Sequence, residues 1–410
     1  MKKNLPLFIF FIFHYVGFSQ DLIISGVYDG PLSGGTPKGV ELYVKADIAD
    51  LSAYGLGSAN NGGGTDGQEY TFPSDAVSAG TYIYVSSEST QFQNYFGFST
   101  TYTNGSMGIN GDDALELFYN SSVIDTYGEI DVDGNGDPWE YLDGWAYRVN
   151  NTGPDASWVQ NNWTYSGANA VDGCTTNNGC SSTMPVKTYN KLTVSSGTTT
   201  ISTDKTYDVV ELTGGTITIN KDASLTVKMS FSNSGGTVNL NSNKDEYSSI
   251  IVQGTSSGNI TYKRHVADVG GNDEWDYIGS PVAGQNLQTL IDNNSSLATN
   301  GSSVAIAPFD NSASGGDADT SNFYSYYNTT GNSGTTITSG QGFLMATDDG
   351  SSTATVDFTG TINTSNVTFA IDDETSSNTN YGKFNLVANP FPSYIAFNTA
   401  AVSASSATAS

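Results

Sequence analysis

Short runs in which apolar and polar residues alternate, separated by turns rich in Gly and Asn, recur along this chain of 410 residues. Four of them follow one another near the N-terminus, at 39–44, 51–56, 81–85 and 111–118. Alternation with a period of two places apolar side chains on one face of an extended strand. Helix-forming residues are scarce, whereas β-branched and aromatic residues are plentiful. The sequence therefore predicts an all-β protein.

The first 19 residues have the pattern of a secretion signal. Lys2 and Lys3 precede an apolar stretch at 5–13, and small residues lie before a cleavage site at Gln20. The apolar stretch is too short to span a bilayer, and there is no Cys at the cleavage site to carry a lipid. We expect 1–19 to be removed, leaving a chain without a transmembrane segment that is secreted to the extracellular space or the outer cell surface.

The formal net charge of −27 limits the partners that this protein can bind. Such a field repels phosphate backbones and anionic lipids, which excludes nucleic-acid binding through a broad basic surface. It is compatible with divalent cations and with neutral partners such as polysaccharides.

Three regions follow the signal. Region 20–184 has at least seven short strand patterns, which predicts an Ig-like β-sandwich. Region 186–262 has shorter, regular Thr/Val/Ile strands with few aromatic residues, which indicates β-solenoid-like or linker strands. Region 263–410 forms a C-terminal β-rich module. One short helix is expected in the first region, with Ser89 as its N-cap and three aromatic residues at helical spacing, Phe92, Tyr95 and Phe96.

The first region resembles the lamin-tail domain. The resemblance covers about 20–165 and rests on the order of the segments at 22–25, 39–43, 50–56, 114–118 and 123–125. That family is an Ig-like sandwich found in nuclear lamins and in exported bacterial proteins, often beside nucleases, phosphatases or other hydrolases. Its usual Trp-Ile-Glu-Leu is Gly-Val-Glu-Leu here, at 39–42. Since these motifs are patterns of strand and turn, the resemblance implies a fold rather than an activity.

The third region resembles a β-rich module of large surface proteins that Gram-negative bacteria export by the type IX secretion route. The resemblance rests on the segments at 275–282, 340–344, 358–361 and 385–393. In such proteins, further strands and a sorting domain follow the Asn-Pro-Phe-Pro-Ser segment. Here an uncharged run of small residues at 399–410 follows instead. We therefore expect the module to be incomplete: either the sequence is a fragment, with a sorting or catalytic domain encoded after Ser410, or the C-terminal part was lost.

One loop has the spacing of a calcium site. Asp131, Asp133, Asn135 and Asp137 place oxygen ligands at alternate positions, and the intervening glycines permit a tight turn. An EF-hand would also need Glu at its twelfth position, which is Leu142 here. The alternative is a solvated hairpin turn, in which Asp, Asn and Gly are common for backbone reasons. Ca²⁺ is the one cofactor that the sequence indicates.

Four of the five tryptophans lie between 139 and 163. Trp139 and Trp145 are candidates for stacking on a sugar ring or for anchoring a partner. The alternative, which we favour, is that these indoles fill the core of the sandwich.

Cys174 and Cys180 are the only cysteines. In an exported protein, two cysteines six positions apart predict a local disulfide, which stabilises by about 2 kcal/mol in the chain-entropy description. A zinc site would need further Cys or His ligands nearby, and the sequence has none there.

No catalytic constellation stands out. The segment 254–258 matches the Gly-x-Ser-x-Gly pattern of a nucleophile elbow, but a strand-like alternation follows where the elbow needs a helix. His265 is the sole imidazole once His14 leaves with the signal, and nothing around it indicates a triad. The acidic residues lie mostly in Gly/Asn turns, and no carboxylate pair of glycosidase type is distinguished.

The sequence therefore predicts a non-enzymatic protein with a structural or adhesive role, which binds a polysaccharide or a cell-surface protein. One alternative is the accessory part of a secreted hydrolase, nuclease or polysaccharide-degrading, whose catalytic domain lies beyond residue 410. Another is a purely architectural chain that spaces other domains from the cell.

Overall fold

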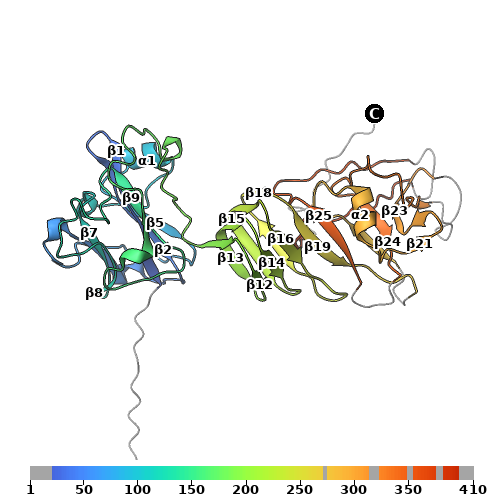
Figure 1. The fold of residues 1–410 in the computed structure, drawn as a ribbon, viewed down its shortest axis with the longest axis horizontal. Helices are drawn as coiled ribbons and strands as arrows, with labels where there is room; N and C mark the ends of the chain where they lie inside the picture. The colour runs from blue at the N-terminus through green and yellow to red at the C-terminus, as the bar shows by residue number, and fades with distance from the viewer. Residues whose placement is uncertain (1–20, 271–274, 314–322, 349–353, 375–381, 397–410) are drawn as a thin grey trace, which may run out of the picture. The chain divides into compact units, whose positions relative to one another are not determined.

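The computed structural model describes residues 21–270, 275–313, 323–348, 354–374 and 382–396. The chain divides into two compact units, unit 1 (Met1–Asn190) and unit 2 (Lys191–Ser410). Among the described residues the fold is mostly β, with two α-helices, which confirms the all-β prediction (Figure 1). The expected signal at 1–19 and the uncharged run at 399–410 lie outside the described residues.

Unit 1 contains two β-sheets. The larger has the strand order β10-β9-β1-β2-β5-β6. Its strands are β1 (Leu22–Leu32), β2 (Thr36–Val44), β5 (Tyr82–Ser86), β6 (Tyr102–Thr103), β9 (Gly144–Arg148) and β10 (Trp163–Tyr165). The smaller sheet has the order β4-β3-β7-β8, with β3 (Tyr54–Ala59), β4 (Tyr70–Thr71), β7 (Ala114–Tyr119) and β8 (Ser122–Tyr127).

The two sheets share one hydrophobic cluster. Leu42 of the larger sheet and Leu56 and Leu117 of the smaller sheet are all fully buried within it. The expected strand at 51–56 is wrong in its first half, because the Asp50 carboxylate accepts the Ser52 N–H and starts a short 3-10 turn at Leu51–Ala53. The strand therefore begins only at Tyr54.

The predicted helix is confirmed as α1 (Thr90–Phe96), with Ser89 at its N-cap and without a side-chain capping bond from that residue. Gly97 ends the helix in the left-handed conformation, with φ of 79°, which favours glycine. Its three aromatic residues join a second cluster that covers the other face of the larger sheet, together with Tyr147, Met184 and Tyr189. Residues up to Asn190 thus pack within unit 1.

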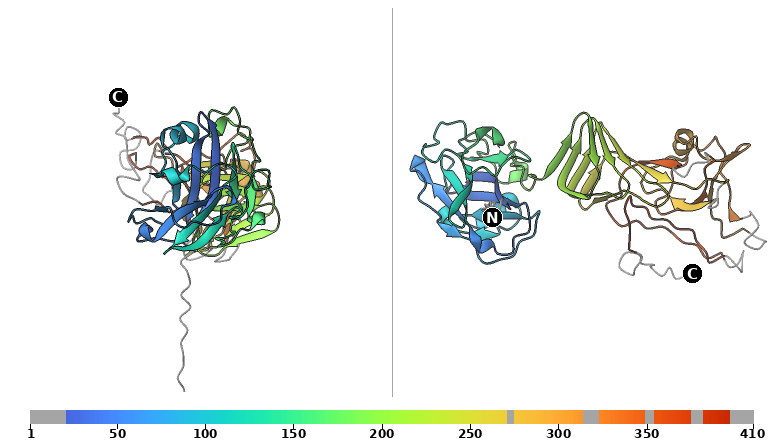
Figure 2. Two further views of the ribbon diagram at one scale, coloured as in Figure 1. Left: turned by 90° about the vertical axis from the view of Figure 1, so that its left-hand side faces the viewer. Right: turned by 90° about the horizontal axis from the view of Figure 1, so that it is seen from below.

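Unit 2 begins with a β-solenoid-like stack of parallel strands, as predicted (Figures 1 and 2). One sheet has the order β11-β13-β15-β17, with β18 also paired to β15, and the other has the order β12-β14-β16-β19-β25. The first sheet contains β11 (Lys191–Val194), β13 (Lys205–Leu212), β15 (Ser224–Asn233), β17 (Ser249–Val252) and β18 (Thr255–Ser257). The second contains β12 (Thr198–Ile201), β14 (Thr216–Ile219), β16 (Thr237–Leu240), β19 (Ile260–His265) and β25 (Thr355–Gly360).

The period of the solenoid is uneven. Paired positions Thr198 and Thr216 are 18 residues apart along the chain, whereas Thr216 and its next partner Thr237 are 21 apart. The extra residues lie at the corner between Ile219 and Leu225 and at a bulge of β15 between Val227 and Ser230. This unevenness hides the repeat in the sequence, although each strand by itself has the expected pattern.

The solenoid and the C-terminal module share one core cluster that runs from Val194 to Ile362. The boundary expected at 262 falls within β19, and β25 pairs antiparallel to that strand. Beyond it lie a three-stranded sheet in the order β20-β24-β23, a hairpin and the second helix. Their bounds are β20 (Asp276–Gly279), β21 (Thr299–Asn300), β22 (Ser303–Val304), β23 (Ile306–Pro308), β24 (Gly342–Met345) and α2 (Leu287–Asn293).

Candidate functional site

Five aromatic side chains, two of them exposed and three half-buried, lie at the three-stranded sheet of unit 2. We call this set the aromatic surface; it consists of Trp275, Tyr277, Phe309, Tyr324 and Tyr326. Tyr277 on β20 is 68% exposed and Tyr326 is 39% exposed. The ring centroids of Trp275 and Tyr326 are 5.8 Å apart, and those of Phe309 and Tyr324 are 5.6 Å apart.

The aromatic surface is uncharged and offers hydroxyl groups. The Tyr324 hydroxyl donates to the Tyr277 hydroxyl at 3.2 Å. Burial is the main cause of a raised pKa at Tyr324, and this hydrogen bond raises it further. Burial also raises the pKa of Tyr326. Both phenols therefore stay neutral at physiological pH. Ring faces with hydroxyl groups at their edges can stack on a sugar and hydrogen-bond to it, but they provide no nucleophile or base.

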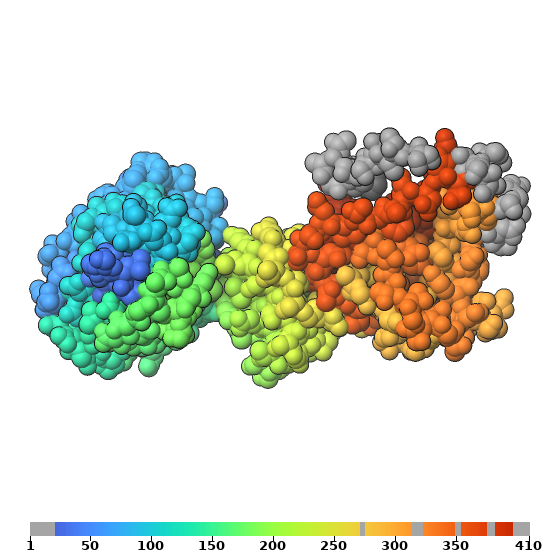
Figure 3. Space-filling view, turned by 90° about the horizontal axis from the view of Figure 1, so that it is seen from above, coloured from blue at the N-terminus to red at the C-terminus, as the bar shows by residue number. Residues whose placement is uncertain are grey.

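A groove of about 210 Å³ lies elsewhere in unit 2, beside the outer edge of β17. Its walls are Ile250–Val252, the segment 362–366 and the segment 391–393, and all of its lining residues are uncharged. The Ile250 N–H donates to the Pro392 carbonyl at 2.8 Å. The Asn-Pro-Phe-Pro-Ser segment, drawn in red, thus lies against the solenoid and covers part of a strand edge (Figure 3).

The predicted calcium loop is an open turn. Asp131, Asp133 and Asn135 are exposed, and the Asp133 carboxylate accepts the Asn135 N–H at 3.1 Å. The Glu140 carboxylate accepts the Gly136 N–H at 3.0 Å. Nowhere in the described part of the chain do three acidic, His or Cys side chains gather closely enough to hold a metal ion. The loop as it stands does not present a ready-made cage, and calcium binding stays a prediction.

Of the two tryptophans considered for stacking, Trp139 is a core residue. It is 2% exposed and packs edge-on against Tyr127, with centroids 6.1 Å apart, so neither face of the indole is open to a ligand. The core position that we favoured for this indole is the one observed, and the prediction that Trp139 stacks on a ligand is wrong. Trp145 is partly buried, and its Nε1 donates to the Ser182 carbonyl at 3.0 Å.

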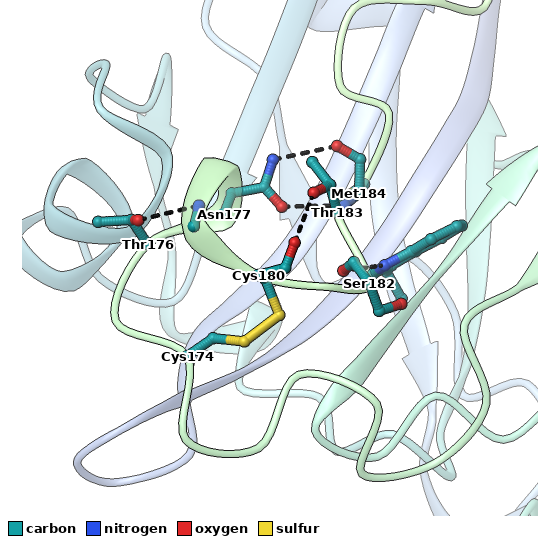
Figure 4. The surroundings of a disulfide bond; sticks show 9 residues. Cys174, Thr176, Asn177, Cys180, Ser182, Thr183 and Met184 are labelled. Carbon is teal, nitrogen blue, oxygen red and sulfur yellow. Dashed lines mark hydrogen bonds between the residues drawn. A yellow bond between two sulfur atoms is a disulfide. The ribbon is translucent and has the colours of Figure 1, made fainter.

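The disulfide between Cys174 and Cys180 is present, with Cα atoms 5.3 Å apart (Figure 4). Within the loop that it closes, Asn177 is buried and bonds twice to Met184. Its Nδ2 donates to the Met184 carbonyl at 3.0 Å, and its Oδ1 accepts the Met184 N–H at 2.9 Å. Because Met184 belongs to the second cluster of unit 1, the loop fixes the segment that covers the larger sheet.

Glu41 on β2 is fully buried beneath that segment and accepts four hydrogen bonds. Oε1 accepts from Ser25 Oγ at 2.7 Å and from the Tyr147 hydroxyl at 2.6 Å. Oε2 accepts from the Tyr84 hydroxyl at 2.5 Å and from the Lys187 N–H at 2.9 Å. Burial raises the pKa of Glu41, and the hydrogen bonds oppose the rise. With its lone pairs occupied, this carboxylate is a structural hub and not a catalytic base.

A buried ion pair ties the two sheets of unit 1 together. Arg148 Nη2, at the end of β9, lies 2.7 and 2.8 Å from the two carboxylate oxygens of Asp125 on β8. Arg148 Nε also donates to the Ile24 carbonyl at 2.6 Å, and its guanidinium lies 4.4 Å from the centre of the Trp163 ring. Arg148 Nη1 donates to Asp155 Oδ2 at 3.1 Å, so all three nitrogens of the guanidinium are hydrogen-bonded within the protein.

A third buried carboxylate, Asp29, lines a small cavity in unit 1. The cavity has a volume of about 10 Å³, which is room for a single water molecule. Lys38 Nζ lies 3.2 Å from Asp29 Oδ1. Burial raises the pKa of Asp29 to about 6, although the ammonium of Lys38 opposes the rise. A perturbed carboxylate beside so small a cavity has no space for a substrate.

The rejected nucleophile elbow is a corner between two strands. Ser256 lies on β18, and Gly258 turns the chain with φ of 80° directly into β19, so no helix follows. His265 is at the end of β19, where its backbone N–H donates to Ser242 Oγ at 2.7 Å.

Sequence reasoning missed the aromatic surface. The available signal was the spacing by two of Trp275 and Tyr277, and of Tyr324 and Tyr326, which places each pair on one side of an extended segment. Which side faces solvent depends on the core beneath, and that core draws on residues from Val194 to Ile362.

The sequence profile of a family described as Domain of unknown function (DUF8693) matches residues 152–408. The chain belongs to this family. The match begins inside unit 1 and includes the disulfide loop, the solenoid and the aromatic surface. No curated protein and no solved structure matches the chain. Neither of the α-helices that the structure describes is long and apolar enough to cross a membrane.

Proposed function

We propose that this protein is an exported, non-catalytic adhesin of the cell surface that binds neutral polysaccharide. The observation that carries the proposal is the aromatic surface, where an exposed Tyr277 and its neighbours gather on one side of unit 2. Aromatic faces with hydroxyl groups at their edges suit the apolar faces and hydroxyl rims of sugars. The strongly negative net charge disfavours anionic polymers, so the polysaccharide is a neutral one.

Unit 1, in this proposal, is an Ig-like sandwich of lamin-tail type. Its two sheets, the hydrophobic cluster that they share and the buried Arg148–Asp125 pair between them support that assignment. It would act as a rigid support, since its buried polar groups bond to one another. Secretion through the signal at 1–19, and the resemblance of the C-terminal module to type IX surface proteins, support a location outside the cell.

The absence of catalysis is part of the proposal. Glu41 and Asp125 are buried carboxylates saturated by hydrogen bonds, and Asp29 borders a cavity of one water molecule. Each has a structural partner that explains its burial. A perturbed carboxylate in an open, substrate-sized cleft would instead have pointed to an enzyme.

The test is retention of residues 20–410 on insoluble neutral polysaccharides, measured by pull-down and by affinity electrophoresis on soluble forms. The double variant Tyr277→Ala/Tyr326→Ala should lose about tenfold in affinity, because each aromatic contact contributes about 0.5–1.5 kcal/mol beyond its buried area. Tyr394→Ala is the matched control, since Tyr394 is an equally exposed tyrosine of unit 2 (70%) outside the aromatic surface.

Failure of the wild-type chain to bind any neutral glycan would refute adhesion through this surface, as would equal losses in the two variants. The same panel is assayed for turnover. A rate that disappears on replacement of one side chain would show that the protein is an enzyme.

A further inference from the structure

The outward face of the second solenoid sheet consists of threonine and asparagine. We call it the threonine face. Pairing aligns Thr198 with Thr216 and Thr237, and aligns Thr200 with Thr218 and Asn239. Asn239 pairs with Thr261, which pairs with Thr359. Continuing the ladder by one residue past Ile260 and Gly360 adds Asn259 and Thr361, both exposed.

The threonine face therefore has two columns, of which one is paired across five strands and the other is paired across three strands and continues past the ends of β19 and β25. One column is Thr198, Thr216, Thr237, Asn259 and Thr361; the other is Thr200, Thr218, Asn239, Thr261 and Thr359. The residues between the columns, such as Ile217 and Val238, point inward and are buried in the core. All ten outward positions are uncharged, in a chain whose net charge is −27.

Strand propensity alone does not explain this composition. Threonine is favoured on exposed strands, and that preference would act on both sheets of the solenoid. The opposite sheet instead carries an ion pair on its outward side, with Lys191 Nζ 2.6 Å from Glu211 Oε2. On the second sheet, the nearest charged residues are Lys263 and Asp357, two positions along the strands from Thr261 and Thr359. Their Nζ and Oδ2 atoms lie 2.8 Å apart at the border of the threonine face.

The columns form a regular lattice of hydroxyl and methyl groups. Neighbouring strands are about 4.8 Å apart, and positions i and i+2 of a strand are about 6.7 Å apart. Five strands therefore extend the array to about 19 Å. Threonine is stiff about χ1, so the groups are held in place before any ligand arrives. Thr261 Oγ1 and Thr359 Oγ1 are already hydrogen-bonded at 3.0 Å.

We propose that the threonine face binds ice. Its two repeats are close to the two repeats of oxygen atoms on the prism face of hexagonal ice. Hydroxyl groups on such a lattice can replace water molecules at lattice positions, and the methyl groups between them hold water in ordered shells. A charged side chain would orient water around itself instead. This activity is independent of polysaccharide binding, because the aromatic surface contributes no residue to it.

The test is ice recrystallisation inhibition and thermal hysteresis of residues 20–410. Thr218→Lys replaces the second of the five positions of one column, between Thr200 and Asn239, and should abolish both effects. Thr226→Lys is the matched control: it makes the same change at a half-buried threonine in the middle of the opposite sheet, between Thr206 and Ile251, and should retain both. Circular dichroism and thermal melting verify that the two variants fold alike.

Ice growth that the wild-type chain leaves unaffected overturns the proposal, and so does an equal loss in both lysine variants. Binding to crystalline cellulose or chitin that depends on Thr218, without any effect on ice, also overturns it and assigns the face to a polysaccharide. The variant Tyr277→Ala/Tyr326→Ala should keep full ice activity, so failure of the adhesion proposal is seen separately.

Discussion

Replacing Glu41 tests whether its four hydrogen bonds hold unit 1 together. Glu41→Met removes both acceptor oxygens while roughly keeping the side-chain volume. Ser25 Oγ retains a bond to the Glu41 backbone carbonyl at 3.1 Å. Three buried donors lose an acceptor, namely the hydroxyls of Tyr84 and Tyr147 and the N–H of Lys187.

Each buried donor left without a partner costs about 1–3 kcal/mol of stability. Removing Glu41 also removes the desolvation penalty of its buried carboxylate, which offsets part of this loss. We expect Glu41→Met to lower the free energy of unfolding of unit 1 by about 4 kcal/mol. Glu41→Gln keeps one acceptor oxygen, and hydroxyl groups facing the new amide can rotate to accept from it. Its loss should be about 1–2 kcal/mol.

The assay is urea unfolding followed by tryptophan fluorescence, which reports mainly on unit 1 because four of the five tryptophans lie between 139 and 163. Glu129→Gln, at an exposed glutamate of the same unit, is the control and should change little. A Glu41→Met variant as stable as wild type would show that the network contributes nothing, and the reasoning from buried donors would be wrong.

Two further predictions concern unit 1. Burial raises the pKa of Asp29 from 3.8 to about 6, so the folded state holds its proton more tightly, and this stabilisation is lost as pH rises from about 4 through 6. Over this range the free energy of unfolding of wild type should fall by up to about 3 kcal/mol relative to that of Asp29→Asn, as measured by urea unfolding at pH 4 and pH 7. An equal change with pH in the two proteins would contradict the raised pKa of Asp29. For calcium, millimolar Ca²⁺ should raise the melting temperature of wild type but not of Asp131→Asn/Asp133→Asn, and an unchanged wild-type melt would leave that loop as a solvated turn.

Local patterns sufficed where neighbouring residues decide the structure. Helix α1 follows from aromatic residues at helical spacing, and the disulfide follows from two cysteines six positions apart in an exported chain. The solenoid strands were also visible one by one, because each alternates within itself. All of these signals act over fewer than about a dozen residues.

The tertiary structure decided which of these side chains meet. Trp139 packs against Tyr127 and Trp158, and Glu41 is bonded by groups as distant in sequence as Lys187, so neither environment can be read locally. The threonine columns depend on register between strands 18 and 21 residues apart, where unequal corner loops conceal the repeat. Alternation along a strand is a short-range property of the backbone, but whether a given face meets core or water depends on packing between distant segments.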